Sequence, residues 1–177
     1  MIRQARACLE PGAAVICDFE TTDLGGVGIE LAVIDAAAGA VLLNTLISPD
    51  GVRVEDGARA VHGITDDELA DAPRWRDVFP AFLAAVEGKM ILAYNAQFDS
   101  STVAITHEHA GLPAGQLPPR RQWWCLMEAL SAWRRVGRWS PLGGSHRALG
   151  DAQAARQVLL QLTAPIGSCR TGSSTRR

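Results

Sequence analysis

The chain has 177 residues, of which 47% are hydrophobic and 20% are charged. This length is typical of one domain of roughly 100–200 residues, and it leaves no room for a second domain. The hydrophobic content is sufficient for a buried core, which excludes an intrinsically disordered protein. The formal net charge of −2 gives no sign of the strong basicity that marks many nucleic-acid-binding proteins.

The charges are divided unevenly along the chain. Residues 1–99 contain 7 basic and 16 acidic side chains, whereas residues 100–177 contain 10 basic and 3 acidic ones. Such asymmetry indicates an anionic partner for the second part or, as the more common alternative, an arginine-rich face that is simply solvated.

Cysteine spacing and hydrophobic runs indicate the environment of the protein. Cys8, Cys17, Cys125 and Cys169 are too far apart in the sequence for a zinc-binding motif. A chain that can build a full core does not need disulfides, so we expect a reducing compartment. Because the sequence shows no apolar targeting segment and no run of about 18 apolar residues, we expect a soluble, cytoplasmic protein without membrane contact.

The first part of the sequence predicts three successive strands and then two helices. The strands are expected at residues 13–19, 28–34 and 40–47. The segment Thr65-Asp66-Asp67-Glu68 predicts a capping box that begins a short helix. The spacing of apolar residues over 78–86 predicts a second helix, which ends at Gly88.

The rest of the sequence alternates strands with helices, which favours an α/β layer fold with a mixed sheet. We expect residues 1–12 to be an N-terminal extension, residues 13–163 to form the domain and residues 164–177 to be a disordered tail. The further elements are a strand at 90–94, a helix from 95 to about 110, a strand or helix start at 123–127, a helix at 128–135, a loop at 137–145 and a helix at 147–162.

Three acidic residues are expected at one edge of the predicted sheet. Asp18 and Glu20 end the first strand, and the two-residue period of a strand places both carboxylates on one face. Asp99 lies in the first turn of the helix that Asn95 opens, next to another strand end. Repelling carboxylates at one place favour Mg²⁺ or Mn²⁺ as a compensating cation. The alternatives are a solvated strand end for the pair and an acid that only complements the helix dipole for Asp99.

His146 and Asp151 form a second group before and within the last long helix. On one continuous helix their five-residue separation corresponds to about 140° of rotation, so His146 has to precede the helix if both side chains face one site. A histidine can take a proton from water near neutral pH, although a surface or packing role is the common alternative. Together, the carboxylates and the histidine describe two metal ions that activate water for attack on a phosphodiester.

Three segments then carry a specific resemblance. Residues 18–22 (DFETT), 95–99 (NAQFD) and 146–152 (HRALGDA) resemble, in order and spacing, the three motifs of the DEDDh 3′–5′ exonuclease family, and residues 62–65 (HGIT) resemble a further element of that family. The resemblance spans residues 13–162. It implies a ribonuclease H-like α/β fold with a mixed five-stranded sheet flanked by helices.

The resemblance also implies roles for single residues. Asp18, Glu20, Asp99 and Asp151 would hold two Mg²⁺ or Mn²⁺ ions, His146 would be the general base, and nucleoside 5′-monophosphates would leave from a 3′ end. A stacking role suits the aromatic ring of Phe98, whose alternative is a place in the core. The residues implied to contact the terminal nucleotides are Thr21, Thr22, Leu24, His62, Asn95 and Phe98.

A segment rich in arginine and tryptophan lies between residues 120 and 139. Such a combination can bind phosphates and stack on bases. The alternative is an amphipathic helix with buried tryptophans and solvated arginines; it is slightly favoured for the tryptophans, and substrate contact is favoured for the arginines. The residues concerned are Arg120, Arg121, Arg134, Arg135 and Arg138 with Trp123, Trp124, Trp133 and Trp139.

We therefore expect a stand-alone, metal-dependent 3′–5′ exonuclease that acts on single-stranded DNA or RNA 3′ ends, with DNA slightly favoured. One alternative is an RNA 3′-end trimming or short-RNA exoribonuclease, because the difference depends on contacts to the 2′-hydroxyl. Another is a proofreading-type module that docks on a DNA polymerase or other replication or repair protein. A binding domain without catalysis is disfavoured because all five matching catalytic residues are present.

Overall fold

The computed structural model describes residues 1–164, and its centre is a five-stranded sheet. The strand order is β3-β2-β1-β4-β5; β1, β2 and β3 are antiparallel neighbours, whereas β4 and β5 run parallel to β1. The expected mixed five-stranded sheet is confirmed. The strands are β1 (Ala14–Thr21), β2 (Gly28–Asp35), β3 (Val41–Leu46), β4 (Met90–Ala93) and β5 (Trp123–Cys125).

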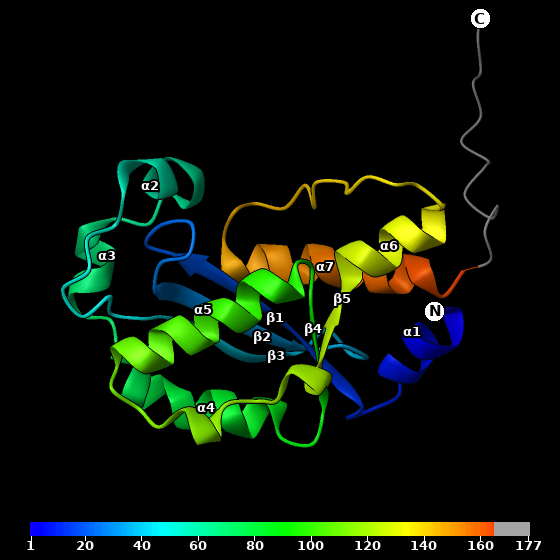
Figure 1. Cartoon of the computed structure of the whole chain (residues 1–177), viewed down its shortest axis with the longest axis horizontal. Helices are drawn as coiled ribbons and strands as arrows, with labels where there is room; N and C mark the ends of the chain where they lie inside the picture. Colours follow the sequence, from blue (N-terminus) through cyan, green and yellow to red (C-terminus); the bar gives the residue numbers. More distant parts are fainter. Residues whose placement is uncertain (165–177) are drawn as a thin grey trace, which may run out of the picture.

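Helices cover both faces of the sheet, and α2 and α3 project from one end of it (Figure 1). The helices are α1 (Ile2–Cys8), α2 (Asp56–His62), α3 (Asp66–Ala70), α4 (Trp75–Val86), α5 (Ala96–His109), α6 (Leu126–Arg134) and α7 (Ala148–Leu162), with 3₁₀ turns η1 (Ala114–Gln116) and η2 (Arg120–Gln122).

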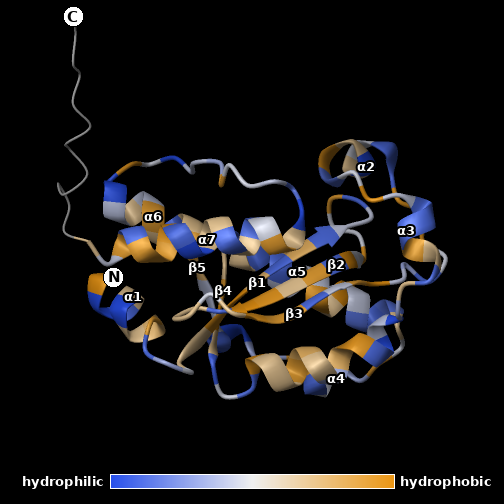
Figure 2. Ribbon diagram, turned by 180° about the vertical axis from the view of Figure 1, so that it is seen from behind, coloured by the Kyte–Doolittle hydropathy of each residue, from blue (hydrophilic) through white to orange (hydrophobic). Residues whose placement is uncertain are grey.

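The alternation of side chains along β1 produces two apolar layers. Ile16 points to one face and packs with residues of α1, α6 and α7, whereas Cys17 and Phe19 point to the other face and pack with α4 and α5. Figure 2 shows the central strands as mostly hydrophobic ribbons between these helices. Because β1 is buried from both sides, its C-terminal end is a rigid place for polar side chains.

The structure differs from the expected elements in three places. β1 continues through Glu20 and Thr21, beyond the apolar run, because these residues still pair with Glu30 and Gly28 of β2. The helices α1 and α2 were not predicted, since both are short. The ambiguous segment 123–127 contains both predicted forms, as β5 leads directly into α6.

Other expectations are confirmed or fall outside the described chain. Thr65 and Glu68 form the predicted capping box at the start of α3. The expected disordered tail falls, apart from residue 164, outside the described residues. Within residues 1–164, no helix combines the length and the apolar character needed to cross a membrane.

Candidate active site

Three carboxylates meet where the end of β1 faces the start of α7. Asp18 and Glu20 point to the α7 side of the sheet, as Ile16 does, because β1 alternates its side chains. Asp151 lies in the first turn of α7. Each of these residues offers a carboxylate oxygen, and the three oxygens lie within 4.8 Å of one another. The predicted common face of Asp18 and Glu20 is thus observed.

Asp99 is the fourth carboxylate at this place. It lies in the first turn of α5 and is buried, and its Oδ1 accepts a hydrogen bond of 3.2 Å from the backbone N–H of Phe19. It is not one of the three clustered acids, but it lines one cavity with them. The residues that line this carboxylate cavity are Asp18, Phe19, Glu20, Tyr94, Asn95, Phe98, Asp99, Leu142, His146 and Asp151.

His146 lies in the loop before α7, as its spacing from Asp151 predicts. Its backbone N–H donates a hydrogen bond of 3.0 Å to Oδ1 of Asp151, and its φ of 55° is left-handed. A Cβ atom at Gly144 would collide with the carboxylate of Asp151 as it is placed, so glycine permits this close approach without moving the acid. The loop is therefore held against the first turn of α7, with the exposed imidazole at the cavity.

Burial and mutual repulsion raise the pKa values of Asp18, Glu20 and Asp99. The pKa of Asp18 lies well above its usual range because of burial and, secondly, the charges of Asp99 and Asp151. Burial, followed by the charge of Asp151, raises the pKa of Glu20 to about 7. Burial raises the pKa of Asp99 to about 8, although the N–H of Phe19 stabilises its charged form. Without a cation, Asp18, Glu20 and Asp99 keep protons at pH values where exposed carboxyl groups have lost them.

The donor chemistry fits a hard divalent cation. Mg²⁺, Mn²⁺ and Ca²⁺ prefer oxygen ligands such as these carboxylates. A cation between Asp18, Glu20 and Asp151 would offset the repulsion that, together with burial, raises the pKa values of Asp18 and Glu20. The cluster therefore has both the ligands and the electrostatic need for a metal ion.

A neighbouring cavity continues from the carboxylates and shares Glu20 and Phe98 with them. His62 is only 5% exposed; its Nδ1 accepts a hydrogen bond of 3.0 Å from the N–H of Ile64, whereas its Nε2 makes no hydrogen bond within residues 1–164. The residues that line this cavity are Glu20, Thr21, Asp23, Leu24, Gly57, Ala58, Val61, His62 and Phe98. It thus gathers four of the six residues implied to contact nucleotides.

Thr22 and Asn95 complete the set of expected contact residues. Thr22 lines neither cavity: it is buried, and its hydroxyl oxygen accepts a hydrogen bond of 3.1 Å from the N–H of Val27. Its side chain stabilises the turn after β1. Asn95 occupies the N-cap position of α5, but its side chain makes no capping hydrogen bond in the described structure, and it lines the carboxylate cavity.

The segment rich in arginine and tryptophan is divided by the fold. Arg120 and Arg121 lie in η2 before β5, whereas Arg134, Arg135 and Arg138 lie at the end of α6 and in the loop that follows. The predicted burial of tryptophan holds for Trp133, which packs in the core, and partly for Trp123 and Trp124. It does not hold for Trp139, which is 68% exposed.

The structure adds residues that were not among the predicted site residues. Tyr94 and Leu142 line the carboxylate cavity, and Asp23 and Val61 line its neighbour. Asp23 and Tyr94 adjoin the first and second motifs, whereas Leu142 and Val61 come from the loop before α7 and from α2, and no local pattern marks them. Glu30 carried a usable signal, since it is the single charged residue inside the apolar run 28–34.

The raised pKa values predict how the stability of the metal-free protein depends on pH. The folded protein holds protons on Glu20 and Asp99 up to about pH 7 and 8, whereas unfolded carboxyl groups release them near roughly pH 4. Because the folded state binds these protons more tightly, the free energy of unfolding should fall as pH rises through this window. In chelator, we expect a lower melting temperature at about pH 8.5 than at about pH 6.

Calorimetry with Mn²⁺ and with chelator measures this effect. Mn²⁺ should restore most of the lost stability at the higher pH, because the cation replaces the protons as compensating charge. Asp99→Asn should show a weaker pH dependence in chelator. Equal melting temperatures with Mn²⁺ and chelator at about pH 8.5 would contradict a cation site at these carboxylates.

Comparison with known proteins agrees with this geometry. A family model described as Exonuclease, of the RNase T type, matches residues 15–159. An uncharacterized exonuclease, CP81, of Escherichia phage 186 is 35% identical over 100 residues, which are 55% of this chain and 50% of that protein. The DNA polymerase III subunit epsilon of Haemophilus influenzae is 31% identical over 102 residues, 51% of this chain and 40% of that protein. The matched region thus spans half or less of these relatives.

Solved structures show the same fold. Exonuclease X in complex with 5′ overhanging duplex DNA superposes with a TM-score of 0.60 and 28% identity, over 84% of this chain and 90% of that one. Escherichia coli Exonuclease I in complex with a dT13 oligonucleotide has a TM-score of 0.67 over 83% of this chain and 40% of that one, and its 17% identity supports the fold alone. Since the family model matches well over half of its residues, the chain belongs to the RNase T exonuclease family.

Proposed function

We propose that the protein is a divalent-metal-dependent 3′–5′ exonuclease that releases nucleoside 5′-monophosphates from single-stranded nucleic acid. The convergence of Asp18, Glu20 and Asp151 within 4.8 Å is the observation that carries this proposal. Asp99 and His146 line the same cavity and support the proposal, because they supply a fourth acid and a base. The family to which the chain belongs agrees with this chemistry.

Each catalytic side chain has a separate role in the proposed reaction. Asp18, Glu20, Asp99 and Asp151 would hold two Mg²⁺ or Mn²⁺ ions, which when bound supply positive charge for the attacking water and the leaving 3′-oxygen. The imidazole of His146, exposed at the cavity, would take a proton from the water. The hydrogen bond from its backbone to Asp151 keeps the base beside the carboxylates. No side chain becomes covalently attached.

The neighbouring cavity is the proposed place of the terminal nucleotides. Leu24 is 89% exposed at the tip of the turn after β1, and Phe98 borders both cavities, so both can pack against bases. Because Nδ1 of His62 accepts a hydrogen bond, its neutral ring carries the proton on Nε2. This atom is buried, so donation to an oxygen of the nucleotide requires the ring to move towards the cavity that His62 lines. Thr21 lines the same cavity and Asn95 lines the carboxylate cavity, so both can contact the nucleotide, whereas Thr22 acts through the turn after β1.

DNA is the proposed substrate in preference to RNA. Exonuclease X, which is more similar in sequence to this chain than Exonuclease I is, was solved with duplex DNA, and several curated relatives are named as DNA polymerase III subunits. The same names make a polymerase or other replication or repair protein a candidate partner. An RNA-trimming role is the alternative, and it requires contacts to the 2′-hydroxyl that a comparison of matched DNA and RNA oligomers would detect.

Replacing one cluster acid should remove catalysis and leave the fold intact. Asp18→Asn keeps the shape of the side chain but removes its charge, so we expect no detectable Mg²⁺-dependent release of mononucleotides from a 3′-labelled oligomer. Asp67→Asn, an equal change at an exposed acid of α3, should keep the parental rate. Parental degradation by Asp18→Asn would contradict the mechanism, and product release from the 5′ end would contradict the polarity.

The arginines after α6 are the proposed contacts of the incoming strand. The hydroxyl of Tyr94, which lines the carboxylate cavity, donates to the carbonyl of Ser140. Arg134 donates a hydrogen bond of 3.0 Å from Nη1 to the hydroxyl of the same Ser140, which links its guanidinium through Tyr94 to the wall of the cavity. Exposed Trp139 lies next to Ser140 in the sequence and can stack on a base.

Salt dependence tests this strand path. Arg134→Ala should weaken binding of a single-stranded oligomer and reduce the slope of log K against log salt concentration by about 0.7, the value for one lost phosphate contact. Arg3→Ala, at an exposed arginine of α1, is the matched control and should leave the slope unchanged. An unchanged slope in Arg134→Ala removes this arginine from the path.

A further inference from the structure

Glu30 is a buried acid beside the carboxylate cluster, but it is not part of the cluster. It is 6% exposed in the middle of β2, and the strand register places it directly opposite Glu20. Cross-strand partners point to the same face of a sheet, so Glu30 lies on the α7 side, as Glu20 does. Glu30 lines neither of the two cavities, so a contact with metal or substrate does not explain why an acidic residue is buried here.

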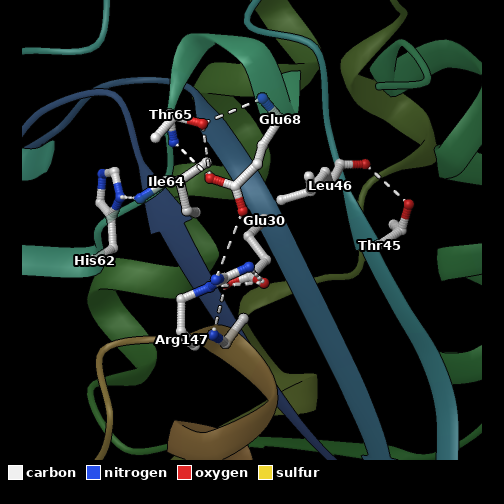
Figure 3. A network of polar contacts seen from close by, with 9 residues as sticks. Glu30, Thr45, Leu46, His62, Ile64, Thr65, Glu68 and Arg147 are labelled. Carbon is white, nitrogen blue, oxygen red and sulfur yellow. Dashed lines mark hydrogen bonds and ion pairs between the residues drawn. The ribbon is translucent and has the colours of Figure 1, made fainter. Parts of the chain in front are cut away.

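The carboxylate of Glu30 is instead occupied by Arg147. Nε of Arg147 donates to both oxygens at 3.1 Å, and Nη2 donates to Oε1 at 2.8 Å (Figure 3). Such a fork of donors fixes the orientation of both groups, which a single ammonium group cannot do. Burial of the acid thus depends on one particular arginine.

The same carboxylate also caps α7. The N-cap residue of α7 is Arg147, whose side chain makes no capping hydrogen bond in the described structure and has no acceptor to offer. The first helical N–H, that of Ala148, donates to Oε2 of Glu30 at 2.9 Å. Glu30 therefore replaces the missing local cap from another strand, and its charge is favourable at a helix N-terminus.

This contact fixes the part of α7 that carries the chemistry. His146 directly precedes Arg147, and Asp151 lies one turn after Ala148. The opposite wall of the cavity is β1, which pairs with β2 through the register Glu20–Glu30. A shift of the helix start relative to β2 would therefore move Asp151 and His146 away from Asp18 and Glu20.

Arg147 makes a second, weaker contact. Its Nη1 lies 3.9 Å from Oε1 of Glu68, and both side chains are partly exposed, so solvent screens this pair. Oε2 of Glu68 is engaged in the capping box with Thr65 at the start of α3. The Glu68 contact thus offers a matched comparison: the same arginine and the same residue type, without the cap of α7.

We propose that Glu30 and Arg147 are positioning residues that hold the N-terminus of α7 so that Asp151 and His146 meet Asp18 and Glu20. This inference rests on the proposed function. Because each oxygen of Glu30 already accepts hydrogen bonds from Arg147 or Ala148, the residue acts on the cluster through α7 and does not bind the metal itself.

Glu30→Gln tests the proposal with little change of shape. The amide would present donors to the arginine fork, so α7 would lose its fixed position. Partners behind metal ligands typically contribute about 10–100-fold to metal affinity or activity, and we expect a loss of that size in Mn²⁺ affinity by calorimetry and in kcat, with KM changed less than threefold. Arg147→Lys, which keeps the charge but not the fork, should show the same pattern.

Glu68→Gln is the control, since glutamine also caps helices, and it should keep Mn²⁺ affinity and kcat within about twofold. If Glu30→Gln does not fold, Arg147→Lys decides the question. Parental Mn²⁺ affinity and kcat in a folded variant of either residue would overturn the positioning role while leaving the proposed function intact. Lost Mn²⁺ affinity in a protein whose parent shows no exonuclease activity would instead support the positioning role and refute the function.

Discussion

Repulsion between closely spaced carboxylates is the constraint on which the rest of the structure depends. Asp18, Glu20 and Asp151 lie within 4.8 Å of one another, and buried Asp99 adds a further charge that Asp18 experiences. Such an arrangement raises proton affinity and opposes ionisation, so it persists only where the surrounding fold determines it or a cation compensates for it. Burial first, and repulsion second, raise the pKa values of Glu20 and Asp99.

The central strand β1 fixes the positions of two of the acidic residues. β1 is buried between two apolar layers and paired on both sides, so the positions of Asp18 and Glu20 are fixed by the sheet. The acids from α5 and α7 lie in first helical turns, where an acid complements the helix dipole. On the proposed account, Glu30 and Arg147 supply the remaining constraint, because α7 has no local cap of its own.

Local patterns in the sequence predict much of this site. A period of two places Asp18 and Glu20 on one face, and the helical period requires His146 to precede α7, as it does. Patterns fail where contacts join distant segments: Glu30 and Arg147 are 117 positions apart. Motifs also fail to predict local contacts: the position of Thr22 in a motif does not reveal that its hydroxyl accepts a hydrogen bond from Val27 in the turn after β1. The net charge of −2 likewise hides the separation of the acidic cluster from the arginines after α6.

Anomalous X-ray diffraction from crystals grown with Mn²⁺ and a nucleoside 5′-monophosphate tests the proposed cation site most directly. We predict manganese peaks in contact with Asp18, Glu20 and Asp151, with the base of the nucleotide in the neighbouring cavity beside Phe98 and His62. A carboxylate cavity without manganese at a saturating concentration would contradict the claim that these charges are arranged for a divalent cation.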